Sequence, residues 1–191
     1  MNARRRVLTW RTTDRTGYET AWAEPSGPSS FRAHGRAFGL SPAPYWLTYE
    51  LETGEHWATR RIRVSVEAES SVRNLELERG ADGGWTADGE PLAGLAEALD
   101  CDLGRSPLTN AMPVLRHRLH RAPGEHDVVT AWIAVPELVV RASRQRYTHV
   151  SRAPGGAVVR FASGDFRSDL TLDREGFVVH YPRLAERVSV G

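Results

Sequence analysis

Residues 45–69 read YWLTYELETGEHWATRRIRVSVEAE, and this stretch decides the fold class. From Tyr45 to Leu51 every second residue is apolar, while the residues between them are mostly polar. A period of two is typical of a β-strand with one buried face. The same alternation returns between residues 58 and 68, and Thr53-Gly54-Glu55 separates the two segments as a tight hairpin turn would. We therefore predict that an antiparallel meander begins at Tyr45.

Further strand patterns follow along the chain, bounded by turns that are rich in Pro, Gly or Asp. VRNLELER, the Gly-rich GADGG and Trp85 predict another hairpin. Later strands are predicted at residues 126–135, 137–150, 157–163, 166–173 and 176–182.

Two short helices are predicted in the middle of the chain. PLAGLAEAL, residues 91–99, places its apolar residues at helical spacing behind Pro91 at the first helical position. Ser106-Pro107 can cap and open a second helix in the same way.

The two halves of the chain follow one pattern. Residues 75–85 and 170–182 both run from a strand through an acidic, Gly-containing turn to an aromatic strand. This similarity predicts an internal duplication, in which repeats at about residues 5–90 and 121–190 flank a central segment at 91–120.

The strand patterns together predict a mainly β fold. We expect one large curved antiparallel sheet, a half-barrel-like meander with one or two short helices, in a single domain over residues 1–191. A large twisted sheet must curl, so its concave face is the expected ligand site.

Composition and charge narrow the range of functions. All 25 basic residues are Arg, and 24 acidic residues balance them to a formal net charge of +1. This balance argues against a nucleic-acid partner, which would require a basic surface. The absence of Lys excludes lysine Schiff-base chemistry and a phosphate-binding P-loop, because both need the amine. We expect no cofactor.

Cys101 is the only cysteine, so no intrachain disulfide can form, as is usual in a reducing compartment. Polar residues follow Trp10, where a secretory signal would need a longer apolar run. No stretch approaches the roughly 20 consecutive apolar residues of a membrane span. We therefore expect a cytoplasmic protein without a membrane span; the sequence does not set its oligomeric state.

Four segments of the chain carry a resemblance to a known family. They are DCDLGRSPLTN with the following Met112-Pro113, the Gly-Gly-Trp turn that ends at Trp85, PELVV followed by Gln145 and Tyr147, and the closing LTLDREGFVVHYPRL, which contains Tyr181. These segments resemble the putative glycolipid-binding proteins of bacteria, and the resemblance covers most of the chain. It implies a curved half-barrel sheet, similar to lipoprotein carriers that hold acyl chains, and a lipid ligand. One departure is VLRHRL at residues 114–119, where the family pattern runs into an Ile-Arg-Arg-Leu-like stretch.

The stretch from Asp100 to His120 concentrates polar chemistry. Asp100 and Asp102 lie two apart, so a strand would point both carboxylates to one face, where they could do acid/base work or bind a metal. The other interpretation is that both are solvated acids that cap the following helix.

Ser106, Thr109 and Asn110 also allow two interpretations. By chemistry they are capping and turn residues, and each can hydrogen-bond a sugar hydroxyl or a polar head group. Ser106 lacks a G-x-S-x-G context, so we do not expect a nucleophilic serine.

Three histidines and the cysteine are candidate reactive groups. His117, His120 and His126 lack the H-E-x-x-H arrangement and are interrupted by a Pro-Gly break, so exposed hairpin histidines are preferred over a metal site. Cys101 lies between two aspartates, whose charges would raise the pKa of its thiol. We expect a small buried residue there, and no metal.

The strand predicted at 137–150 has a mixed face. Gln145 and Tyr147 could line a cavity as polar anchors among apolar walls. Arg116 or Arg141 could then bind an anionic head group. The other interpretation is an edge strand whose polar residues face water.

These considerations predict a protein that binds an amphiphilic small molecule, a glycolipid or another lipid, in the concave face without catalysis. The predicted ligand-binding residues are Asp102, Ser106, Thr109, Asn110, Arg116, Arg141, Gln145, Tyr147 and Tyr181. Two alternatives stay open. One is a hydrolase or isomerase of a lipid-like substrate that uses Asp100 or Asp102 with His117 or Arg116. The other is a protein-interaction scaffold.

Overall fold

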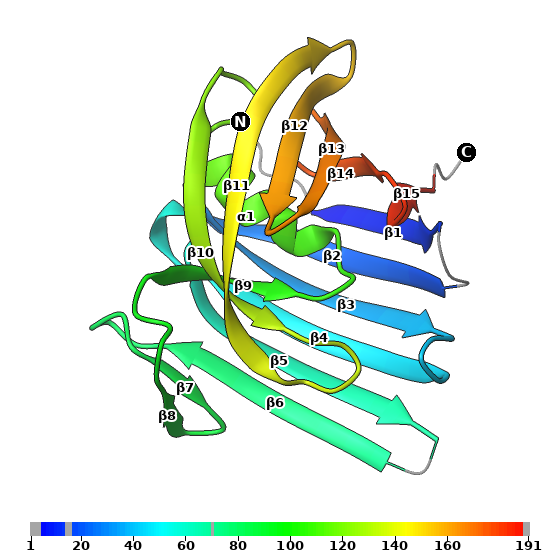
Figure 1. The fold of residues 1–191 in the computed structure, drawn as a ribbon, viewed down its shortest axis with the longest axis vertical. Helices are drawn as coiled ribbons and strands as arrows, with labels where there is room; N and C mark the ends of the chain where they lie inside the picture. Colours follow the sequence, from blue (N-terminus) through cyan, green and yellow to red (C-terminus); the bar gives the residue numbers. More distant parts are fainter. Residues whose placement is uncertain (1–4, 14–16, 70, 189–191) are drawn as a thin grey trace.

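A computed structural model describes residues 5–13, 17–69 and 71–188. Fifteen strands of this described part form one curved sheet, which confirms the predicted mainly β fold (Figure 1). In chain order the strands are β1 (Arg6–Thr12), β2 (Gly17–Gly27), β3 (Ser30–Gly39), β4 (Tyr45–Thr53), β5 (Thr59–Ala68), β6 (Ser71–Arg79), β7 (Trp85–Ala87), β8 (Glu90–Leu92), β9 (Ala98–Leu103), β10 (Glu125–Ile133), β11 (Val140–Ala153), β12 (Gly156–Ser163), β13 (Phe166–Asp173), β14 (Val178–Tyr181) and β15 (Ala185–Arg187).

Strands that follow one another in the chain are neighbours in the sheet almost throughout. β1 to β8 form one antiparallel run, β10 to β15 form another, and β1 pairs with β15 to join the two runs. β9 pairs in parallel with β10 at one edge. Because each strand is rotated relative to the next, a sheet of this size curls (Figure 1). The curl brings β9 against β5, where the Cys101 N–H donates to the Thr59 hydroxyl at 2.9 Å.

The hairpin predicted for residues 45–69 is confirmed. Leu47 and Tyr49 of β4 are buried, whereas Trp46 is 63% exposed. The turn into β5 contains Gly54 and a single 3₁₀ turn, η1 (Glu55–Trp57). The alternation of apolar and polar residues therefore places one face of this hairpin in the core.

Three strands precede the predicted start of the meander. The inward residues of β2 and β3 include Ala21, Ala33 and Gly35, whose small side chains give only a weak apolar alternation. They are small because β4 fills the space above them. A Cβ atom at Gly35 would lie 2.3 Å from the ring of Tyr49.

The helix predicted for residues 91–99 does not form. This stretch contains β8, a turn and the start of β9. The Trp85 Nε1–H and the Arg79 Nε–H both donate to the Ala98 carbonyl at 3.0 Å, which holds β9 against the first half of the sheet. Contacts with distant residues thus override a short helical periodicity.

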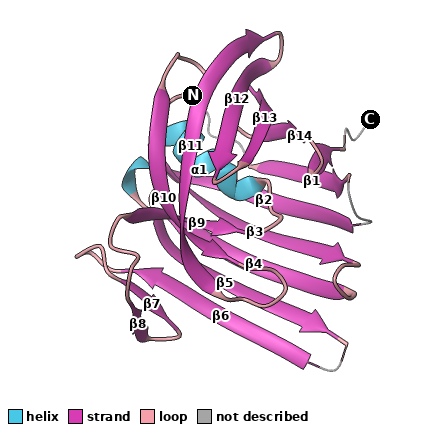
Figure 2. Cartoon of the chain, viewed as in Figure 1, coloured by secondary structure: helices cyan, strands magenta, loops and turns pink. Residues whose placement is uncertain are grey.

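The second predicted helix is confirmed, and it lies inside the curve of the sheet. It consists of the 3₁₀ turn η2 (Leu108–Asn110) and α1 (Ala111–Arg116), drawn in cyan in Figure 2. The Ser106 hydroxyl accepts the Leu108 N–H at 3.3 Å, as a capping residue does. Every residue from 106 to 114 is buried.

The concave face was predicted to hold the ligand, and here the structure corrects the prediction. The central segment occupies this face with its own side chains, including Leu108 and Met112, which are both 0% exposed. A pocket beside it, lined by Glu19, Tyr49 and Ser106 among others, has a volume of about 30 Å³, enough for one water molecule and far below the size of a lipid. No helix in the described residues is long and apolar enough to cross a membrane.

Candidate functional site

The two aspartates of the central stretch lie on β9 and are engaged inside the protein. Asp100 is 1% exposed, and its carboxylate accepts two hydrogen bonds from the guanidinium of Arg116, one of them at 2.7 Å from Nη1 to Oδ2. Burial raises the pKa of Asp100, and the Arg116 charge opposes this rise. The interpretation of Asp100 as a solvated capping acid is therefore wrong.

Asp102 joins the central segment to β11. Its Oδ1 accepts the Thr109 hydroxyl at 3.1 Å, and its Oδ2 accepts the Gln145 side-chain amide at 2.6 Å. Burial raises the pKa of Asp102, while both hydrogen bonds lower it. The predicted common direction of the two aspartates is confirmed, since both carboxylates point from β9 to partners beside α1.

Tyr147 extends these contacts. Its single O–H faces two acceptors, Asn110 Oδ1 at 3.1 Å and Gln145 Oε1 at 3.2 Å, and can donate to either. Tyr147 is 2% exposed, and burial raises the pKa of its hydroxyl well above the usual value. We call the following residues the central network: Asp100, Asp102, Thr109, Asn110, Arg116, Gln145 and Tyr147.

Ser106 belongs to a different cluster, which the sequence did not reveal. Its hydroxyl donates to Glu19 Oε1 at 2.7 Å, and the Tyr49 hydroxyl donates to the same oxygen at 2.7 Å. Burial raises the pKa of Glu19 to about 7, although both hydrogen bonds lower it. The sequence signal for this cluster is Glu19, a single acid among the inward residues of β2. It could not be recognised because β2 itself was not predicted.

Arg141 and Tyr181 are not part of the central network. The guanidinium of Arg141 lies 4.4 Å from the ring centroid of Trp132, and its side chain is exposed. Tyr181 is buried 6.2 Å from the ring of Phe161 in the core beneath β12 to β14. Its pKa is raised mainly by burial and to a lesser degree by the charge of Asp102.

The cysteine and the histidines have structural surroundings. Cys101 is 1% exposed, as predicted, and its thiol pKa is raised to about 12 mainly by burial, with smaller effects from the two aspartates. The histidines are not exposed hairpin residues: His120 is buried, and the rings of His117 and His126 stack at 3.9 Å. Burial, followed by the charges of the neighbouring His126 and Arg116, lowers the pKa of His117 to about 4. In the described ranges, no group of three or more His, Cys, Asp or Glu side chains could hold a metal.

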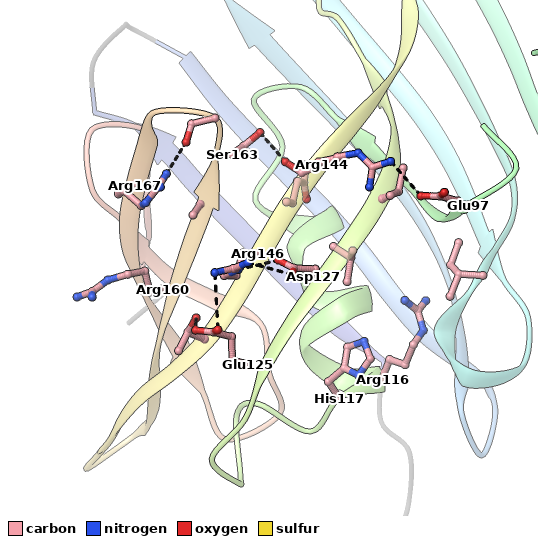
Figure 3. Close-up of a pocket in the computed structure, with 17 residues that line it drawn as sticks. Glu97, Arg116, His117, Glu125, Asp127, Arg144, Arg146, Arg160, Ser163 and Arg167 are labelled. Carbon is pink, nitrogen blue, oxygen red and sulfur yellow. Dashed lines mark hydrogen bonds and ion pairs between the residues drawn. The ribbon is translucent and has the colours of Figure 1, made fainter. Parts of the chain in front are cut away.

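A groove of about 900 Å³ lies along β9 to β13, mostly on the side of these strands that faces away from the core (Figure 3). We call it the outer groove, and it is lined by Glu97, Leu99, Arg116, His117, Glu125, Asp127, Val128, Val129, Arg144, Gln145, Arg146, Thr148, Arg160, Ala162, Ser163, Gly164 and Arg167. Most of these residues alternate along their strands with residues that point to the core, such as Tyr147.

The outer groove extends to the end of α1 because the edge of β10 is partly uncovered. β9 pairs with β10 only from Val129 onward. Beyond that point Arg116 and His117 line the groove (Figure 3). Arg116 and Gln145 therefore belong both to the groove and to the central network.

Charged and apolar groups share the outer groove. Leu99, Val128, Val129 and Ala162 supply apolar surface, and five arginines and three carboxylates supply charge. Of these arginines, only Arg116 is among the ligand-binding residues predicted from the sequence. The sequence signal for the other groove arginines is the alternating pair Arg144 and Arg146 on β11. Their role in lining a groove becomes evident only when the partner strands β10 and β12 are known.

Comparisons with known proteins agree with this architecture. The sequence matches the family described as "Putative glycolipid-binding" over residues 7–187. No curated protein matches the sequence. A solved crystal structure of a DUF1089 family protein from Pseudomonas aeruginosa is similar, with 27% sequence identity, a TM-score of 0.78, and coverage of 94% of this chain and 95% of that one.

Proposed function

Because the chain belongs to the family described as putative glycolipid-binding, we propose that it binds an amphiphilic small molecule of the glycolipid type, without converting it, in the outer groove. The observation that carries the proposal is the groove itself. Its volume of about 900 Å³ falls within the range of roughly 300 to 1,000 Å³ that is usual for small-molecule sites.

The lining of the groove suits a molecule with two unlike ends. Leu99 and Val129 supply apolar surface where β9 meets β10, and each methylene buried there would stabilise binding by about 0.8 kcal/mol. Polar groups surround this surface on β11 to β13. Guanidinium and carboxylate groups can hydrogen-bond the hydroxyls of a sugar in several directions at once.

The proposal of binding without catalysis is supported by how the candidate acid and base groups are held. Both carboxylates of β9 accept hydrogen bonds within the fold, Asp100 from Arg116 and Asp102 from Thr109 and Gln145. The His117 imidazole has a lowered pKa and stacks on His126. A general base must come within hydrogen-bond reach of its substrate, and neither Asp100 nor Asp102 lines the outer groove.

The proposal can be tested by filling the groove. An environment-sensitive fatty-acid probe is titrated into the protein and then displaced by a glycolipid with a single acyl chain. The variant is Ala162→Trp, which places an indole inside the groove. The matched control is Ala142→Trp, because Ala142 is exposed on β11 but does not line the groove.

We expect Ala162→Trp to weaken the probe at least tenfold and Ala142→Trp to leave its affinity unchanged. Thermal melting curves of both variants establish that each is folded. A wild type that binds neither probe nor glycolipid would overturn the proposal, as would equal affinities for the two folded variants.

A further inference from the structure

We infer that the end of the outer groove at the β12–β13 turn is an anion subsite, formed by Arg144 and Arg167, which takes a phosphoryl-type oxyanion as the head group of the amphiphile. This inference rests on the proposed function and names the class of ligand. The arginines of the groove differ in the partners that they bind.

Two of the groove's arginines are paired with carboxylates on neighbouring strands. Arg146 binds Asp127 through two hydrogen bonds at 2.6 and 3.0 Å, and Arg160 binds Asp169 in the same manner at 2.7 and 2.9 Å. Each pair joins residues that stand directly opposite on neighbouring strands. A ligand that used these guanidinium groups would have to displace a forked carboxylate.

Arg167 is engaged differently. Its Nη1 donates to the carbonyl oxygens of Gly164 and Phe166 at 2.5 and 3.0 Å, which are neutral acceptors on its own turn. Within the described residues no ion pair joins Arg167 to a carboxylate. Its side chain is exposed and lines the groove, so its positive charge is available to a ligand.

Arg144 has one exchangeable partner. Its Nη2 contacts Glu97 at 3.2 Å, and the two side chains are 81% and 69% exposed. Exposed pairs of this kind contribute at most about 1 kcal/mol, so an oxyanion with several oxygens can replace Glu97 at little cost. A planar guanidinium also presents a fork of donors that matches phosphoryl oxygens.

Ser163 lies between the two arginines in the close-up view (Figure 3). Its hydroxyl donates to the Arg144 carbonyl at 3.2 Å, which holds the end of β12 beside β11. The same hydroxyl lies 3.3 Å from Ser143 Oγ on the core-facing side of the sheet, so Ser163 holds β12 against β11 and leaves anion binding to the two arginines. Asp165 in the same turn is not among the residues that line the groove.

The subsite and the apolar surface are arranged for one amphiphile. Val128 and Val129 lie on β10, and Arg167 lies on β13, three strands away in the sheet. At about 4.8 Å between strands this separation is about 14 Å, close to the length of a twelve-carbon chain. A single-chain amphiphile can therefore extend from the apolar surface at β10 to the β12–β13 turn, with its head group at the turn.

The test compares three probes by isothermal titration calorimetry, below the concentration at which micelles form. Dodecyl phosphate carries the oxyanion, dodecyl glucoside carries a neutral sugar on the same chain, and inorganic phosphate carries the oxyanion alone. The variant is Arg144→Gln combined with Arg167→Gln. The matched control is Arg32→Gln combined with Arg36→Gln, since these two arginines are exposed on β3 and do not line the groove.

We expect dodecyl phosphate to bind the wild type at least tenfold more tightly than dodecyl glucoside. The difference should disappear in the Arg144/Arg167 variant, persist in the Arg32/Arg36 control, and narrow when salt is raised from 50 to 500 mM. Equal affinities for the two amphiphiles, or a difference that survives in the Arg144/Arg167 variant, would overturn the anion subsite while leaving the proposed function intact.

Two further outcomes separate the remaining cases. If inorganic phosphate binds as tightly as dodecyl phosphate, the anion subsite stands, and an amphiphile as its source is rejected. If none of the three probes binds, the anion subsite and the proposed function fail together.

Discussion

Arg116 at the end of α1 forms a forked ion pair with Asp100 of β9, while its Nε donates to the His56 carbonyl at 2.9 Å. One guanidinium thereby attaches the central segment both to the edge strand and to the turn between β4 and β5. The Arg116 side chain is only 10% exposed, so it acts mainly as an anchor for α1 rather than as a free head-group ligand.

Arg116→Gln should destabilise the protein by about 3–5 kcal/mol, because it leaves the buried Asp100 carboxylate without its counter-charge. Arg144→Gln, which breaks the exposed contact with Glu97, should cost less than about 1 kcal/mol. Urea unfolding of the two variants measures the difference. Equal losses would mean that burial does not distinguish the two ion pairs.

Tyr147→Phe and Asn110→Ala should be energetically coupled. The Tyr147 hydroxyl donates to Asn110, so either change leaves a buried polar atom without this partner, at a cost of about 1–3 kcal/mol. The free energy of unfolding lost by the double variant should be about 1 kcal/mol smaller than the sum of the losses of the two single variants. Free energies of unfolding for the full cycle check this, and strict additivity would contradict the hydrogen bond.

Glu19→Gln should change how stability depends on pH. The folded-state pKa of Glu19 is raised from 4.5 to about 7, so the folded protein binds the proton more tightly than the unfolded chain. Its favourable contribution is complete below pH 4.5 and is lost as pH rises through 7, a change of about 3 kcal/mol. Glu19→Gln should remove this loss, so that the variant gains stability relative to the wild type between pH 5 and 8.

Urea unfolding at pH 5, 6, 7 and 8 measures the effect. Glu24→Gln is the matched control, because Glu24 lies on the same strand and is exposed. If the wild type and Glu19→Gln keep a constant difference across this range, the protonation of Glu19 is not linked to folding.

Gly35→Ala should destabilise the protein by about 1–3 kcal/mol or more. The added Cβ would stand 2.3 Å from the Tyr49 ring, which must then move away from its hydrogen bond with Glu19. Gly155→Ala is the control, because a Cβ there meets nothing within 4 Å, and we expect a change within about 0.5 kcal/mol. Melting temperatures of the two variants provide the comparison.

Local pattern was sufficient for the strands whose buried rows are large and apolar. β4, β5 and β10 to β14 follow the predicted positions because alternation of apolar and polar residues depends only on which face of a strand is buried. β2 and β3 were not predicted because their inward residues are mostly small, so the apolar alternation is weak. The small residues leave room for large side chains on β4, such as Tyr49 above Gly35. The predicted duplication stays a prediction.

The sequence by itself determined the β class, the curled sheet, the helix that begins after Ser106, and the polar residues that would cluster. Asp102, Thr109 and Gln145 do meet, because the residue types that can satisfy one another's hydrogen bonds in the interior are few. Only the tertiary structure decided where those groups point. α1 fills the concave face, so the predicted anchors bind one another, and the groove opens on the outer side among arginines from four separate elements. Such a surface depends on the register between strands far apart in the chain, which no local pattern encodes.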